Sequence, residues 1–182
     1  MDKKLQISKS FKNIMILLIL IGVVAVAVGF LTGDTTRTWA NLLLNNFLFL
    51  SLTLGGLFWM AIQAVTNSGW SAGFIRIPQA LVSYLMVAAV LWVFLFFGLP
   101  HLFQWTISGA ALHSPELAHK SPYLNVPFFI GRIVVFFVLW ILIVRRIRKI
   151  SLEDDIKGSI NSFRKMEFLS KVFIFVLAIS FI

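Results

Sequence analysis

Polar side chains inside apolar stretches are the residues of this sequence that could carry chemistry. Gln63, Gln79, Ser83 and Tyr84 lie near neighbouring ends of two apolar segments. In an antiparallel helix pair they would lie at a similar depth, where they could line a path for protons or water from the cytoplasm. Hydrogen bonding between helices explains the same residues without any such path, and it is the interpretation that these residue types favour.

Arg132 is the residue with the sharpest chemical signal. It lies within two turns of the start of a later apolar segment, where a charge needs a partner or water. Glu116, Asp34, a backbone carbonyl or a polar ligand headgroup could partner it, and snorkelling of the side chain to the membrane interface is an equally good interpretation. The candidates for ligand binding or docking on this outer side are Arg132, Glu116, His119, Asn125 and Trp105.

Several kinds of chemistry are excluded by residue type and spacing. The sequence has no cysteine, so disulfides, cysteine-ligated iron–sulfur clusters and covalently attached haem c are ruled out. Its three histidines all lie within residues 100–126, outside any apolar span, so two helices cannot clamp a haem between them. No metal-ligand spacing, nucleophile elbow or phosphate loop occurs. We therefore predict no catalytic residue, no metal site and no cofactor bound by this chain.

The elements that position these residues are predicted to be transmembrane helices. Of 182 residues, 59% are hydrophobic and 13% are charged, and the mean hydropathy is +0.94. A soluble domain of this size could not cover so much apolar surface. The sequence thus predicts an all-α, polytopic integral membrane protein. Stretches of membrane-spanning length, which needs about 20 residues, cover 14–31, 42–65, 77–99 and 127–144, and 168–182 is interpreted as a fifth helix cut by the end of the sequence.

Orientation follows from the basic residues, which also account for the net charge of +9. Because they flank apolar segments, they indicate orientation in a bilayer and not nucleic-acid binding. With residues 1–13 as a basic cytoplasmic N-terminus, the outer loops carry only Arg37 and Lys120, while the inner segments carry Lys3, Lys4, Lys9, Lys12, Arg76, Arg145, Arg146, Arg148, Lys149, Lys157, Arg164, Lys165 and Lys171. The first span is interpreted as a retained helix, since a signal peptide would have a shorter apolar run.

Two connecting segments complete the predicted organisation. Residues 100–126 form a long outer loop. Ser151 is followed three residues later by Asp154, a spacing typical of a helix start, and apolar residues recur at helical spacing after it. We therefore predict a separate amphipathic helix over 150–167, lying on the cytoplasmic surface. A solvated linker is the weaker alternative.

Three stretches resemble one family of membrane subunits. They are Asn67-Ser68-Gly69-Trp70-Ser71 leading through Phe74 and Arg76, then Leu102-Phe103-Gln104-Trp105, and Lys120-Ser121-Pro122-Tyr123-Leu124-Asn125-Val126-Pro127-Phe128-Phe129 followed by Arg132. Together they resemble the second polysulfide-reductase-like (NrfD-like) membrane subunit of bacterial alternative complex III. The resemblance covers about residues 40–150, and its third stretch is the most specific.

This resemblance implies a multi-pass subunit of the bacterial inner membrane without haem. It implies a sister NrfD-like subunit, periplasmic multihaem cytochrome c and iron–sulfur subunits, lipids and a terminal oxidase as partners. The complex would oxidise quinol or menaquinol, with the haem c and iron–sulfur clusters held by the partner subunits. In this interpretation Gln63, Gln79, Ser83 and Tyr84 form a cytoplasmic half-channel for protons, and Arg132 with the outer loop docks the periplasmic subunits.

Two other classes of protein stay open at this point. A fragment of a secondary transporter would have broken helices near the membrane midplane, whereas the spans here are expected to be continuous. A structural scaffold subunit without any ligand would tolerate apolar replacement of the polar residues. The transporter therefore predicts a helix break within a span, and the scaffold predicts unchanged turnover after the polar residues are replaced.

Overall fold

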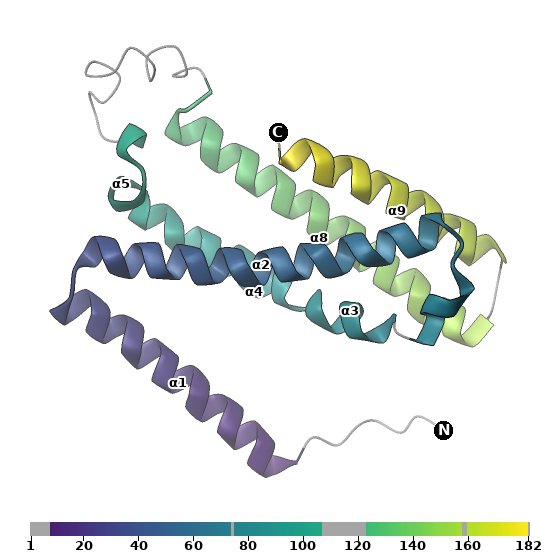
Figure 1. Ribbon diagram of the computed structural model, residues 1–182, viewed down its shortest axis with the longest axis horizontal. Coiled ribbons are helices and arrows are strands. Elements are labelled where there is room, and N and C mark those ends of the chain that lie inside the picture. Colours follow the sequence, from purple (N-terminus) through teal and green to yellow (C-terminus); the bar gives the residue numbers. More distant parts are fainter. Residues whose placement is uncertain (1–7, 74, 107–122, 158–159, 182) are drawn as a thin grey trace.

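The chain is a bundle of long helices. The computed structural model describes residues 8–73, 75–106, 123–157 and 160–181, and no strand occurs among them (Figure 1). Its α-helices are α1 (Lys9–Thr32), α2 (Thr35–Val65), α3 (Arg76–Leu81), α4 (Tyr84–Leu95), α5 (Leu99–Leu102), α8 (Val126–Lys157) and α9 (Ile160–Ser180). Three short 3₁₀ turns are η1 (Gly69–Gly73), η2 (Phe96–Gly98) and η3 (Gln104–Thr106).

Within the described ranges, four helices are long and apolar enough to cross a membrane. They are Lys9–Thr32, Thr35–Val65, the run Arg76–Leu102, and Val126–Glu153. The expectation of an all-α chain with membrane-length helices thus agrees with the structure. The second helix begins seven residues before the expected 42–65, because the carboxylate of Asp34 accepts hydrogen bonds from the backbone N–H groups of Thr36, at 2.9 Å, and Arg37, at 3.4 Å.

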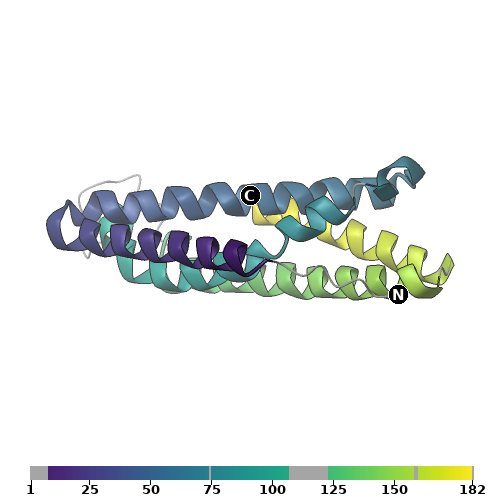
Figure 2. The same cartoon turned by 90° about the horizontal axis from the view of Figure 1, so that it is seen from below.

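Helices α2, α4, α8 and α9 pack together and share one core. The core includes Leu57 of α2, Leu85 of α4, Phe137 of α8 and Phe173 of α9, and Phe173 has no exposed surface. Figure 2 shows these helices running nearly along one direction. We name the two ends of the bundle by their elements, so that the α5 end carries α5, η3 and the start of α8, and the η1 end carries η1 and the start of α9 (Figure 1).

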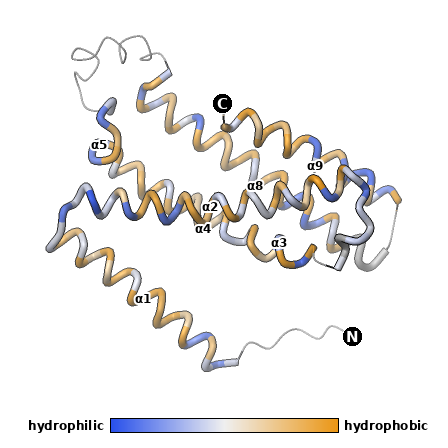
Figure 3. The backbone as a smooth tube through the Cα atoms, in the orientation of Figure 1, coloured by the Kyte–Doolittle hydropathy of each residue, from blue (hydrophilic) through white to orange (hydrophobic). Residues whose placement is uncertain are grey.

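Helix α1 stands apart from this core. None of its residues is buried, and Figure 1 shows it diverging from α2 after the turn that joins them. Figure 3 shows that it is apolar along nearly its whole length. A helix that is apolar on every side is stable in contact with lipid or another transmembrane helix, and its exposure to water is unfavourable.

The third span is interrupted, which corrects the expectation of one continuous helix over 77–99. The backbone N–H of Ser83 bonds the carbonyl of Ala80, and that of Leu85 bonds the carbonyl of Val82, so one turn is 3₁₀ and not α. Thr53 of α2, which is 2% exposed, supports the break, because its hydroxyl lies 3.3 Å from the carbonyl oxygen of Leu81. The interruption separates α3 from α4 (Figure 1).

Replacing Thr53 with valine should destabilise this junction. The change keeps the side-chain shape but removes the hydroxyl that approaches the Leu81 carbonyl and donates to Phe49, 2.9 Å away. Hydrogen bonds between helices in membranes contribute about 0.6 kcal/mol on average and up to about 1.7. We expect a small fall in the melting temperature in detergent. Ser51→Ala is the control, because the Ser51 hydroxyl bonds only the Phe47 carbonyl of its own helix, and an equal fall in both variants would contradict this role.

The prediction of a separate amphipathic helix over 150–167 is wrong. Residues 150–157 continue α8, and α9 begins at Ile160, so the segment is divided between two long helices. No glycine or proline lies between Gly131 and Gly158 to stop α8. Ser151 lies inside α8 and starts no helix. Its buried hydroxyl instead accepts a hydrogen bond from Nε2 of Gln79 at 2.9 Å.

Candidate functional site

The best candidate site is an aromatic cavity between α2, α4, α8 and α9. It has a volume of about 480 Å³, within the range usual for sites of small organic ligands. Four of its lining side chains are phenylalanines on α2 and α8, and two are tryptophans. The residues around it are Phe47, Leu50, Ser51, Leu54, Trp92, Tyr123, Phe129, Arg132, Ile133, Phe136, Phe137, Trp140, Ser180 and Phe181. We call this space the aromatic cavity.

The cavity extends from the α5 end toward the middle of the bundle. Arg132 lies about two turns from the start of α8, and Trp140 lies eight residues further along the same helix. Eight residues of α-helix rise about 12 Å. Arg132, Phe136 and Trp140 follow one another at four-residue intervals, which places them on one side of α8. A flat ligand could therefore enter near Arg132 and lie along this row.

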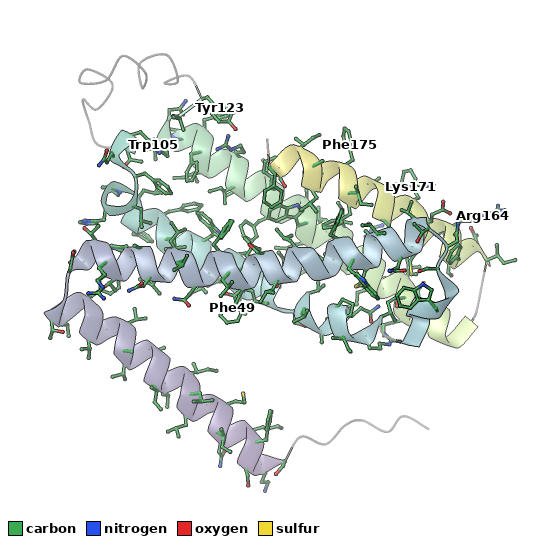
Figure 4. All side chains as sticks on the ribbon, in the orientation of Figure 1. Phe49, Trp105, Tyr123, Arg164, Lys171 and Phe175 are labelled. Carbon is green, nitrogen blue, oxygen red and sulfur yellow. The ribbon has the colours of Figure 1, made fainter. Side chains whose placement is uncertain are left out.

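Arg132 is held by aromatic rings at the edge of the cavity. Its guanidinium carbon lies 4.3 Å from the centre of the Tyr123 ring, 5.8 Å from that of Phe129 and 5.9 Å from that of Phe128. A cation over an aromatic face is stabilised by about 0.5–2 kcal/mol. Tyr123 is at the α5 end in Figure 4. These contacts fix the position of the charge without neutralising it.

Three hydrogen-bond donors around the cavity are buried without a partner among the described residues. They are Nη1 of Arg132 and the indole Nε1 atoms of Trp92 and Trp140. A buried donor left unpaired costs about 1–3 kcal/mol, and more when it is charged. Ser51 and Ser180, in the same wall, donate to the carbonyls of Phe47 and Leu177. The cavity therefore suits a flat, mainly apolar ligand that carries oxygen acceptors.

The other outer-side candidates divide into two groups. Trp105 joins the aromatic cluster beside the cavity, because its ring centre lies 5.3 Å from that of Phe129. Asn125 caps α8, since its side-chain oxygen accepts a hydrogen bond from the N–H of Phe128 at 2.8 Å. Both lie at the α5 end with Arg132, where Figure 4 labels Trp105 and Tyr123. Glu116 and His119 lie outside the described residues.

The four candidates for a proton path are not brought together. Gln63 accepts a hydrogen bond from Ser68, in the turn that follows α2. Gln79 accepts a bond from Nη1 of Arg76 at 2.8 Å and donates to Ser151. Tyr84 donates to the side-chain oxygen of Asn46 at 2.9 Å. Ser83 is exposed, and its backbone N–H takes part in the break of the third span.

The spaces beside Gln79 are also too small for a channel. Two cavities among the described residues that Gln79 lines have volumes of about 20 and 10 Å³, and neither touches Gln63, Ser83 or Tyr84. One ordered water needs roughly 10–15 Å³. Gln63, Gln79 and Tyr84 therefore make separate hydrogen bonds to different neighbours and do not form one polar row. The half-channel stays a prediction without support from their placement.

Trp92 and Trp140 line the cavity but were not predicted as site residues. Tryptophan in a transmembrane helix usually lies at the interface with water, whereas both of these lie inside apolar spans. The four-residue spacing from Arg132 through Phe136 to Trp140 was visible in the sequence as well. The approach of Trp92 to the same space was not, because it depends on how α4 packs against α8.

No protein-family model and no curated protein matches this chain. The class that the structure itself defines is therefore a helical protein with four helices of membrane-spanning length among its described residues. Its candidate site is an apolar, aromatic cavity with one cation and two indole donors.

Proposed function

We propose that the chain is a non-haem membrane subunit of a respiratory complex that oxidises quinol in the bacterial inner membrane. Its N-terminus lies in the cytoplasm and α1 crosses the membrane. The turn between α1 and α2 lies at the α5 end (Figure 1), so this end faces the periplasm. The chain supplies a binding site for the quinone ring, and partner subunits supply the redox groups. The aromatic cavity, with Arg132 and two unpaired indole donors, is the observation that carries the proposal.

Quinone chemistry fits this cavity. A quinone headgroup is a flat ring with oxygen atoms at opposite edges and an apolar tail. Phe129, Phe136 and Phe137 offer aromatic surfaces to the ring. The Arg132 guanidinium at the edge of the cavity can donate to one of its oxygens. The indole N–H groups of Trp92 and Trp140 have almost no accessible surface, so they would donate to a ring oxygen only after a small side-chain movement. The apolar remainder of the wall suits the first part of the tail.

The proposed division of labour follows from what the residues can and cannot do. Oxidation of a quinol releases its electrons and protons together. The sequence holds no cysteine to ligate an iron–sulfur cluster, so the electrons pass to the iron–sulfur and haem c groups of periplasmic partners and on to a cytochrome c or a terminal oxidase. The partners include a sister NrfD-like subunit, as the sequence resemblance implies. The proposal includes no proton path through Gln63, Gln79, Ser83 and Tyr84.

A secondary transporter is the second candidate function, and the interrupted third span favours it. Transporters often bind substrates where membrane helices are broken. The break between α3 and α4 provides such a point at Val82 and Ser83. However, Thr53 already lies beside the Leu81 carbonyl there, and neither Val82 nor Ser83 lines the aromatic cavity. The cavity therefore supports the quinol proposal more directly.

Purification of the tagged chain from native membranes in a mild detergent tests the proposal. We expect multihaem and iron–sulfur proteins to co-purify, with a haem absorbance band. A short-chain quinone should also quench tryptophan fluorescence saturably, since Trp92 and Trp140 line the cavity. A Trp92→Phe, Trp140→Phe variant should lose most of that quenching.

Two results together would overturn the proposal. Recovery of the chain without haem absorbance or partners, together with unsaturable quenching, would remove the respiratory assignment. Uptake of a solute by proteoliposomes of the same preparation would then support the transporter. Retention of partners without quinone binding would instead leave a structural subunit, as the scaffold alternative requires.

A further inference from the structure

A second cavity lies at the η1 end, between α8 and α9, and three cations surround it. Arg146 comes from α8, and Arg164 and Lys165 come from the first turns of α9. The cavity has a volume of about 350 Å³, and Ile150, Phe168 and Leu169 complete its wall. We call it the basic cleft. It lies far from Trp105 and Tyr123, at the end where Figure 4 labels Arg164.

The three cations have no anionic partner among the described residues. Two acidic side chains that the structure describes at this end are already paired, Glu167 with Lys171 at 2.6 Å and Glu153 with Lys149 at 3.9 Å. Arg146, Arg164 and Lys165 are exposed. Three like charges around one space together attract an anion, and an anion bound between them offsets their mutual repulsion. The charge of the basic cleft therefore favours the binding of an anion.

The apolar part of the cleft identifies the kind of anion. Phe168 is 65% exposed, and it lies on the wall together with the cations. Beyond it, α9 continues as an apolar helix through Phe175, which is also exposed. Charged headgroup contacts next to an exposed apolar helix face match the two parts of a phospholipid. Basic pockets between membrane helices recognise anionic headgroups in this way.

We propose that the basic cleft binds one anionic phospholipid. Arg146, Arg164 and Lys165 hold its phosphate, and the first part of an acyl chain lies over Phe168 and along α9. The arginines can each donate two parallel hydrogen bonds to phosphate oxygens, and Lys165 acts as a point charge. The lipid links α8 to α9 beside the point where the chain reverses. This site depends on the membrane placement and is independent of the quinol assignment.

The test is the binding of defined phospholipids to the full chain in detergent. Purified protein is titrated with phosphatidylglycerol or phosphatidylcholine in detergent, and bound lipid is measured by native mass spectrometry. We expect phosphatidylglycerol to bind at least ten-fold more tightly. The affinity of the Arg146→Gln, Arg164→Gln variant for phosphatidylglycerol should be lower by about ten-fold or more. Each basic residue that is removed takes away part of the electrostatic attraction to the anionic lipid.

A matched variant separates this site from general charge. Arg145→Gln, Arg148→Gln removes two positive charges at the η1 end of the bundle but none that lines the basic cleft, and its affinity should change less than two-fold. Equal losses in the two variants would overturn the site. Equal binding of both lipids, or full displacement of phosphatidylglycerol by millimolar inorganic phosphate, would overturn the lipid as its ligand. Phosphate that fails to compete would support it.

Discussion

Arg132→Gln should weaken quinone binding by about 10- to 100-fold while leaving the bundle folded. Hydrogen bonds to a charged group contribute about 1.5–3 kcal/mol, and each 1.4 kcal/mol corresponds to a factor of ten in affinity. Among the described residues that surround the aromatic cavity, Arg132 alone is charged. Quenching of tryptophan fluorescence by a short-chain quinone gives the dissociation constant directly.

Two comparisons make this expectation specific. Arg37→Gln removes a charge at the same end of the bundle, but Arg37 is exposed on α2 and does not line the cavity, so its affinity should stay within two-fold of the parent. Arg132→Lys keeps the charge and loses the planar guanidinium that stacks on Tyr123, and it should lie between the two. An unchanged dissociation constant for Arg132→Gln would remove Arg132 from the site.

The same variants also address assembly. If Arg132 contacts a ligand, its loss should lower quinol turnover of the purified complex while the haem partners still co-purify. If it serves as a docking residue, as the sequence alone suggested, the partners should be lost first. The aromatic contacts to Tyr123, Phe128 and Phe129 hold its guanidinium at the cavity, so we expect the first pattern.

The sequence predicted the long helices because hydropathy alone determines them. A stretch of about 20 apolar residues has few options other than a transmembrane helix, and α1, α2 and α8 cover the expected spans. Hydropathy does not register a single 3₁₀ turn, since Val82 and Ser83 keep right-handed helical angles. The break between α3 and α4 therefore had no clear signal. It depends on packing against α2, where Thr53 approaches the freed carbonyl.

The proton-path prediction used depth in the membrane but not direction around the helix. Successive residues of a helix point about 100° apart, so Ser83 and Tyr84 cannot share one face. Tyr84 faces α2 and bonds Asn46, whereas Gln79 faces α8 and bonds Ser151. Similarly, the signal at Ser151 for a helix start was local, and an uninterrupted run of helix-forming residues outweighed it. Arg132 stood out in the sequence because a charge inside an apolar span is rare, and the structure places it on the wall of the aromatic cavity.

Gly98→Ala should have the largest effect on stability, because no atom can be added at this position without a clash. A Cβ there would lie 2.4 Å from Cδ2 and 2.5 Å from Cε3 of Trp39. Trp39 is only 8% exposed, and its ring is held between Phe30, at 4.9 Å, and Phe94, at 5.1 Å between ring centres. Overpacking of this kind costs about 1–3 kcal/mol. We expect the melting temperature in detergent to fall by several degrees.

The cause of that loss can be isolated because the backbone at Gly98 does not itself require glycine. Its φ of −90° suits any residue, so the penalty should come from the indole alone. Gly131→Ala is the matched control, since a Cβ at Gly131 meets nothing within 4 Å. Shortening the partner in a Gly98→Ala, Trp39→Leu double variant should recover part of the loss, with a coupling energy of about 0.5–3 kcal/mol. Strict additivity of the two changes would show that Gly98 is required for something other than the fit of Trp39.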